Sequence, residues 1–473
     1  MKATSIFGGV QVFQILIGII RSKILAVLLG PTGMGVAGLL QAGTGIVAGF
    51  TNLGLSTGAV KIISEAISQG DKVRIGVVTN VFKRLVWFSG LLGLLASLIL
   101  SRYLSQISFG NGNYTWAFAV LSITLLINQL STGQSALLQA RREIKLLAKA
   151  SIVGSIIGLL LTLPLYYYLG INGIVPAVII ISLTTFISNS YFSSKLSFSK
   201  SSITSTDVRF IGTKMVSLGF IISLSTLIAT LFFYVLRNFI SSIGTIEDVG
   251  QYNAGFSILN TYVGMVFTAM STDYYPKLST LSNKEKEFSL SISQQGEIAV
   301  LVLSPIILIF IVFIKWIVFI IYSDEFYAIN EMIMFASVGM LFKAISWAIA
   351  FSFLAKGDNK IFFWSELICN SYMLFFSLLG YKYLGLTGLG LAFTFSYVLY
   401  AVQVIFLSKR MYNYEMSKEL KIVFIINFVL GILCLQANLY IIHDLLRYCV
   451  GVILIGISLV FNLVCLKRRL ITT

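Results

Sequence analysis

Apolar residues are arranged along the whole chain in runs long enough to cross a lipid bilayer. A transmembrane helix needs about 20 consecutive, mostly apolar residues. Fourteen runs meet this requirement, and short polar links join them. The runs lie near 5–29, 34–60, 79–100, 114–138, 150–170, 173–194, 213–242, 250–275, 293–322, 328–353, 361–384, 386–407, 421–442 and 447–466. The pattern predicts an all-α, multi-pass integral membrane protein with about 14 transmembrane helices.

The composition excludes a soluble globular protein and includes few residues of the types that build catalytic centres. Of the 473 residues, 57% are hydrophobic and only 11% are charged, whereas soluble domains have about 25% charged residues. A single histidine, His443, argues against a histidine-built metal or catalytic centre. No G-x-x-x-x-G-K-[ST] phosphate loop is present. We therefore predict no cofactor, no metal, no catalytic residue and no enzymatic activity.

The basic residues indicate the orientation in the membrane. If the N-terminus is cytoplasmic, 26 of the 34 lysines and arginines fall in or next to inner links, and only four lie at outer ends. Such an excess marks the cytoplasmic side. Both termini are thus predicted to be cytoplasmic. The formal net charge of +16 then reflects topology, and nucleic acid is not predicted as a partner.

The chain contains a long internal repeat. The sequence YYYLGINGI at 166–174 returns as YKYLGLTGL at 381–389, and the link at 140–145 matches that at 355–360, both at an offset of 215 residues. Six predicted spans separate the copies, so both copies have the same orientation. This predicts two six-helix bundles, residues 1–200 and 201–412, related by a pseudo-two-fold axis along the membrane normal. Residues 413–473 form an additional C-terminal helix pair.

Polar residues form stripes on several predicted spans. At 100° per residue, Gln11, Gln14, Gly18 and Arg21 lie on one face of the first span. The other polar candidates for a cavity wall are Gln41 and Asn52 on the second span and Asn260 on the eighth. A polar stripe within the bilayer has to face another helix or a cavity. Simple helix–helix packing through small and hydroxyl residues is the alternative interpretation.

Three of the four cations inside the predicted spans favour a cavity, whereas the fourth, Lys23, points away from the glutamine face of the first span. A charge at the centre of a span costs about 2.5–3.5 kcal/mol on insertion scales. Arg21 lies near mid-span without an acidic residue anywhere in the first 64 positions, and Lys343 is central in its span. Arg237 lies nearer the outer end. We predict that these cations bind an anionic substrate, and that Asp273, at the inner end of the eighth span, either gates the entrance or pairs with Lys277.

Three segments carry a resemblance to a known family. These are 21–35 (RSKILAVLLGPTGMG), 271–278 (STDYYPKL) and 342–357, which begins FKAISW and ends LAKG. Together they resemble Wzx-type O-antigen translocases, in the polysaccharide-transporter branch of the multidrug/oligosaccharidyl-lipid/polysaccharide (MOP) exporter superfamily. The resemblance covers the first twelve predicted spans.

The resemblance implies a flippase of the bacterial plasma (inner) membrane. Its substrate would be an undecaprenyl-pyrophosphate-linked oligosaccharide, moved from the cytoplasmic to the outer leaflet by alternating access during lipopolysaccharide or other surface polysaccharide synthesis. The polymerase and chain-length regulator of the same pathway are implied partners. Related lipid II flippases keep an arginine in the first span, as Arg21 does here, but also one in the eighth, where this chain has AGFS at 254–257. That departure argues against lipid II as the substrate.

Two other functions compete with the flippase. A multidrug or cation antiporter of the same superfamily is expected to line its cavity with carboxylates, whereas the predicted cavity here is basic. A membrane polysaccharide polymerase or ligase is expected to have a sizeable outer loop with catalytic residues, and the outer links are short.

Overall fold

Helices account for the ordered structure of the chain. The computed structural model describes residues 2–196 and 204–472; side chains at 2–12, 470–472 and at positions 205, 221, 222, 225, 262, 268, 269, 272 and 276 lie outside that description. No strand occurs in these ranges. Ten helical segments are long and apolar enough to cross a membrane. The predicted all-α membrane architecture is confirmed.

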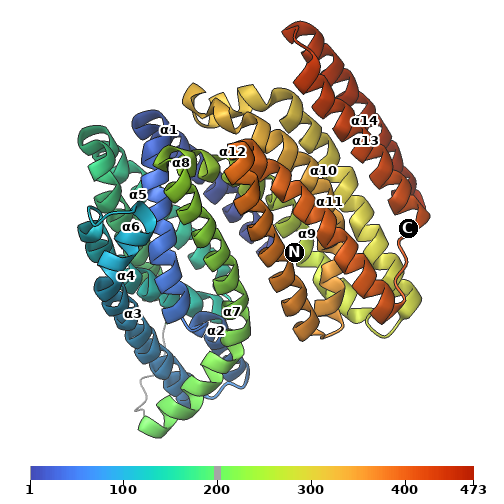
Figure 1. Ribbon diagram of the computed structural model, residues 1–473. Helices are drawn as coiled ribbons and strands as arrows, with labels where there is room; N and C mark the ends of the chain where they lie inside the picture. Colours follow the sequence, from blue (N-terminus) through green and yellow to red (C-terminus); the bar gives the residue numbers. More distant parts are fainter. Residues whose placement is uncertain (1, 197–203, 473) are drawn as a thin grey trace. The chain divides into compact units, whose positions relative to one another are not determined.

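The helices fall into two compact units, Met1–Gly250 and Gln251–Thr473 (Figure 1). The first unit contains α1 (Lys2–Thr51), α2 (Leu55–Ser68), α3 (Lys72–Phe109), α4 (Thr115–Ala140), α5 (Ile144–Leu169), η1 (Gly170–Gly173), α6 (Ile174–Ser193), α7 (Ser205–Ile243) and the start of α8 (Ile246–Ser257). The second contains the end of α8, then η2 (Ile258–Val263), α9 (Met265–Thr280), α10 (Glu285–Ile321), η3 (Asp324–Ile329), α11 (Asn330–Ala355), α12 (Asn359–Tyr412), α13 (Lys418–Tyr440) and α14 (Asp444–Thr472).

Several predicted spans merge into longer helical segments. Helix α1 contains the first predicted span and most of the second, which continues into α2; its helical geometry is broken at Gly30, just before Pro31. Helix α12 contains two more and is broken at Gly385. The predicted span at 250–275 is divided among α8, the π-helical turn η2 and α9, and it is not among the ten apolar segments. Polar residues such as Asn260 lower its hydropathy.

Local sequence explains where individual helices begin. Asp71 caps α3 because its Oδ1 accepts hydrogen bonds from the amides of Val73 and Arg74, both at 3.0 Å. Thr204 and Asp207 form a capping box at the start of α7. The hydrogen bonds from Thr204 lower the pKa of Asp207, so this carboxylate is charged at neutral pH.

The core of the first unit is apolar and drawn from helices distant in sequence. Buried side chains of α2, α3, α4 and α7 form one cluster, with Ile63, Phe82, Leu137 and Met215 among its members. Helices α2 and α7 approach closely because glycines line the contact. A methyl group added at Gly219 would lie 1.9 Å from the carbonyl oxygen of Gly54.

The backbone repeats at the offset found in the sequence. Gly170 has φ 54° and ψ −134°, and Gly385, 215 residues later, has φ 59° and ψ −141°. This region is essentially restricted to glycine. Three residues further on, a methyl added at Gly173 would lie 2.3 Å from the carbonyl oxygen of Leu165, and one at Gly388 would lie 2.0 Å from that of Gly380. The same tight helical turn thus occurs in both copies, which supports the duplication.

The packing units differ from the domains predicted from the repeat. The duplication places residues 201–412 in one bundle, whereas α7 packs against α1, α2 and α3 within the first unit. Helix α7 belongs to the first unit because of its glycine-lined contact with α2. A sequence repeat gives no information about such a contact. The division at residues 200 and 412 therefore stays a prediction about sequence units.

Candidate functional site

A cavity of about 250 Å³ lies within the second unit, between α11 and the two halves of α12. Its charged side chains are Lys343 and Glu366. The remaining lining residues are Ser346, Trp347, Ala350, Phe351, Phe362, Cys369, Asn370, Met373, Tyr397 and Tyr400. Ser346 and Ala350 lie one and two turns after Lys343 on α11, and their small side chains leave room beside its ammonium group.

Lys343 is held by dipoles and aromatic faces. Its Nζ donates a hydrogen bond to Oδ1 of Asn260 at 3.2 Å. The same nitrogen lies 5.3 Å from the ring centre of Tyr397, 5.8 Å from that of Phe393 and 5.9 Å from that of Phe267. Cation–π contacts of this length are worth roughly 0.5–2 kcal/mol each. They offset part of the cost of a charge within a span.

Asn260 reaches Lys343 from an irregular turn. It lies in the π-helical turn η2, a type of turn that is frequent at functional sites. The two residues are 83 positions apart in sequence. The structure thus brings together two of the predicted cavity residues.

Glu366 is the acidic partner in this cavity. Its carboxylate interacts electrostatically with Lys343 and accepts a hydrogen bond from the hydroxyl of Tyr400. Lys343 and Glu366 therefore line the same cavity, with opposite charges and no direct ion pair between them among the described residues. Glu366 is not among the residues predicted from the sequence, although a lone acid within the apolar run 361–384 is itself a signal of function.

Two of the family-like segments meet next to the cavity. The hydroxyl of Tyr274 donates to the carbonyl of Ala348 at 2.7 Å, and its ring lies 5.7 Å from that of Trp347. The ring centre of Trp347 in turn lies 5.4 Å from that of Phe267 and 5.1 Å from that of Phe351. An aromatic wall with a few polar groups suits a ligand with flat, weakly polar faces, such as a sugar or an organic cation.

Arg21 occupies a second polar site, within the first unit. It interacts electrostatically with the buried Tyr166 of α5. Among the residues that the structure describes, its Nε is buried and has no hydrogen-bond partner. Gly18, one turn before it on α1, has open space where a side chain would lie. A buried guanidinium donor without a hydrogen-bond acceptor in the described chain can pair with an anion.

The other predicted cavity residues have mixed surroundings. The amide of Gln14 donates to the hydroxyl of Ser151 on α5, which is a helix-packing contact. Gln41 is exposed, and Oδ1 of Asn52 is buried without a partner in the described chain. Arg237 is partly buried on α7. Gln11 lies outside the residues whose side chains are described.

Asp273 lies exposed on α9. Among the ion pairs of the described residues, none links it to Lys277. Its role as a gate stays a prediction.

Taken with these sites, the fold defines the class: a multi-pass helical membrane protein with charged residues beside a largely aromatic interior cavity. A family model described as "Polysaccharide biosynthesis protein" matches residues 24–331, more than half of the chain. The protein therefore belongs to this polysaccharide biosynthesis family. Comparison with curated protein sequences gives no match.

Solved structures show the same fold. An inward-facing multidrug-resistance MATE transporter of the MOP superfamily has a TM-score of 0.71 at 17% identity, covering 85% of this chain and 94% of that one. Lipid II flippase MurJ in an inward closed conformation has a TM-score of 0.69 at 14% identity, covering 97% and 99%. At these identities the likeness establishes the fold alone. The predicted MOP-type architecture is confirmed. The Wzx-type assignment stays a prediction.

Proposed function

We propose that the protein is a flippase for lipid-linked oligosaccharides in bacterial surface polysaccharide synthesis. The substrate class is an undecaprenyl-pyrophosphate-linked repeat unit, carried from the cytoplasmic to the outer leaflet of the plasma membrane by alternating access. The family match supports a role in polysaccharide biosynthesis. A flippase of known structure with the same fold acts on lipid II, and the proposal extends that chemistry to a related substrate.

Arg21 carries the proposal. A pyrophosphate has at least two negative charges, and a guanidinium pairs with such a group through two parallel hydrogen bonds. The buried, unpartnered Nε of Arg21 would gain an acceptor when the headgroup binds. Within the second unit, Lys343, Asn260 and the aromatic wall offer a point charge, adaptable hydrogen bonds and stacking surface of the kind that suits a sugar.

Replacement of Arg21 in cells with one gene copy tests this function. We expect Arg21→Ala to abolish surface polysaccharide and to accumulate the lipid-linked precursor in the inner leaflet, at normal membrane levels of the protein. Arg21→Lys should retain part of the activity, because an ammonium keeps the charge but not the paired donors. Measurement combines polysaccharide gels with extraction of the precursor.

Lys23→Ala is the matched control, because it removes a cation two positions away on the same helix. On a regular helix these positions point about 160° apart. The control should keep normal polysaccharide. Normal polysaccharide in Arg21→Ala cells would contradict the proposal.

One observation favours a second candidate, a cation antiporter. Glu366 places a carboxylate in an aromatic cavity, which is the chemistry expected for an organic cation. The two functions predict opposite effects of neutralising Lys343 and Glu366.

A further inference from the structure

A second cavity lies where the C-terminal helix pair meets α10. Its volume is about 450 Å³, within the range of sites that hold small ligands. It is formed by one turn of α10, the first turns of α13 and the last turns of α14. The lining residues are Gln294, Glu297, Glu419, Ile422, Val423, Phe461, Cys465, Arg468 and Arg469.

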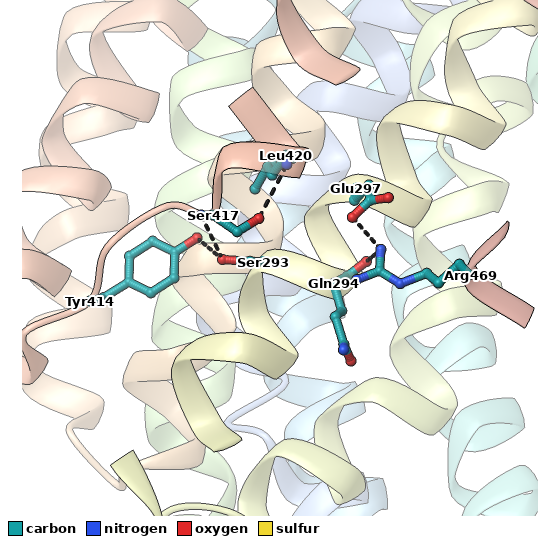
Figure 2. Close-up of polar contacts among 7 residues, drawn as sticks. All are labelled: Ser293, Gln294, Glu297, Tyr414, Ser417, Leu420 and Arg469. Atoms are coloured by element: carbon teal, nitrogen blue, oxygen red, sulfur yellow. Dashed lines mark hydrogen bonds and ion pairs between the residues drawn. The ribbon is translucent and has the colours of Figure 1, made fainter. Parts of the chain in front are cut away.

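One side of this cavity is rigidly built. Arg469 forms an ion pair with Glu297 and donates to the carbonyl oxygen of Gln294 at 3.5 Å. The side chain of Glu297 is 8% exposed and that of Arg469 is 21% exposed. Figure 2 shows Arg469 reaching toward α10, where these two partners lie. Because the pair is largely withdrawn from solvent, it fixes the end of α14 against α10.

The start of α13 is tied to the same turn of α10. Ser293 Oγ contacts the hydroxyl of Tyr414 at 3.1 Å and accepts from the amide of Ser417 at 3.3 Å. Ser417 caps α13 by accepting from the amide of Leu420 at 3.1 Å (Figure 2). Burial raises the pKa of Tyr414 to about 12, so its hydroxyl is neutral at physiological pH. The cavity therefore has fixed walls on both sides.

The cavity combines both signs of charge with an apolar floor. Glu297 is engaged by Arg469, while Glu419 and Arg468 are exposed at its rim. Ile422, Val423 and Phe461 supply the apolar part. The rim thus presents a carboxylate from α13 and a guanidinium from α14 above hydrocarbon.

The position in the membrane restricts what can bind. Both α13 and α14 are among the candidate spans, so the start of α13 and the end of α14 lie at a membrane surface. Lys418, Lys421 and Lys467 lie at the same ends, as is typical of an interfacial belt of basic residues. A ligand reaching this place from the bilayer has a charged head and an apolar tail.

We propose that this cavity binds an aminophospholipid of the phosphatidylethanolamine type. Arg468 and Arg469 would receive the phosphate, Glu419 would accept hydrogen bonds from the primary ammonium, and Ile422 and Phe461 would contact the acyl chains. A purely anionic lipid would satisfy the arginines but leave Glu419 facing negative charge. A choline headgroup has no N–H to donate to that carboxylate.

Lipid retention by the purified full-length protein tests the site. The protein is delipidated in detergent, offered dioleoyl phosphatidylethanolamine, phosphatidylglycerol or phosphatidylcholine, and the bound lipid is counted by native mass spectrometry. We expect a preference of about fivefold for phosphatidylethanolamine, the size of one charged contact at a membrane surface. Glu419→Gln should remove the preference for phosphatidylethanolamine over phosphatidylglycerol. Arg468→Gln should weaken the binding of phosphatidylethanolamine and of phosphatidylglycerol.

Matched controls remove the same charges outside the cavity. Lys467→Gln and Glu415→Gln change exposed neighbours and should leave the preference intact. Cross-linking with a photoactivatable phosphatidylethanolamine should label residues within 419–423 or 461–469, which checks the site independently of any substitution. Equal retention of the three lipids, an unchanged preference in Glu419→Gln, or displacement by undecaprenyl phosphate would overturn the proposal.

Discussion

Lys343 illustrates how a charge is kept inside a membrane-spanning helix. Its ammonium has an amide acceptor from Asn260, aromatic rings at 5.3–5.9 Å and the nearby carboxylate of Glu366. Each contact is worth on the order of 1 kcal/mol, and together they offset part of an insertion cost of about 3 kcal/mol. These contacts explain how a lysine side chain is accommodated beside a cavity within a span.

Neutralising each member of this pair distinguishes an anionic from a cationic ligand. For a pyrophosphate ligand, Lys343→Gln should weaken binding by about tenfold or more, equivalent to 1.4 kcal/mol, because a partly buried charge contact is lost. Glu366→Gln should leave binding unchanged or stronger, because it removes a competing anion. Titration of the purified protein with a short-chain prenyl pyrophosphate measures both effects.

A cationic ligand reverses these expectations. Weaker binding of an organic cation in Glu366→Gln, together with stronger binding in Lys343→Gln, would support the antiporter. Lys382→Gln serves as the control, because this exposed lysine lies outside the cavity lining.

At the scale of helices, glycines decide how closely neighbours approach. Helices in a bilayer associate mainly through close packing and not through water exclusion. Gly54 and Gly58 at the start of α2 lie against the backbone of α7, at Gly219 and Met215. Gly54 also has a φ of +64°, which favours glycine on conformational grounds.

Gly219→Ala should destabilise the first unit. The added methyl would lie 1.9 Å from the carbonyl oxygen of Gly54, so α2 and α7 must move apart, at a cost of roughly 1–3 kcal/mol. Thermal unfolding in detergent should show a lower midpoint. Gly456→Ala, where nothing lies within 4 Å of the added methyl, should have no such effect, and an equal loss in both variants would refute the packing argument.

At the scale of the whole molecule, polar contacts attach the C-terminal helix pair to α10 within the second unit. Besides the Arg469–Glu297 pair, Ser304 contacts Ser458 at 3.3 Å, and Asn438 donates to the carbonyl of Ile311 at 2.7 Å. Within the pair, Asn427 and Asn462 exchange hydrogen bonds at 3.1 and 3.2 Å. The contacts extend along α10, so the pair is a bound part of this unit.

Arg469→Gln should destabilise the protein through the charge it leaves behind. Removing one partner of a buried ion pair costs about 3–5 kcal/mol, because the other charge stays buried. Glu297→Gln in the same chain should recover much of that loss. Thermal unfolding of the two single variants and the double variant gives the coupling energy, and additive losses would show that the pair is not coupled.

The orientation of the whole chain is also testable. In a background with the four cysteines replaced, a cysteine at Gly70 should react with a membrane-impermeant maleimide only after the cytoplasmic side is opened. A cysteine at Asn113 should react in intact spheroplasts. Both positions lie in exposed links. The opposite labelling pattern would contradict cytoplasmic termini.

The helical architecture was largely predictable, and the sites only in part. Backbone hydrogen bonds have to be made within each span, so apolar run length predicts helices directly. Charges within apolar runs drew attention to Arg21 and Lys343. Glu366 was not predicted because its importance comes from lying next to Lys343. The unit boundary at Gly250 was not predicted because it depends on how closely α7 packs against its neighbours.

Sequence alone determined that this is a helical membrane protein with a duplicated pattern, because hydropathy and the return of YYYLGINGI as YKYLGLTGL are properties of the sequence itself. Tertiary structure decided which polar groups meet. Lys343 donates a hydrogen bond to Asn260, which is 83 residues away in sequence, and Arg469 donates one to the carbonyl of Gln294, which is 175 residues away. Such contacts depend on the rotation and depth of each packed helix, and these are settled jointly by all the side chains between them.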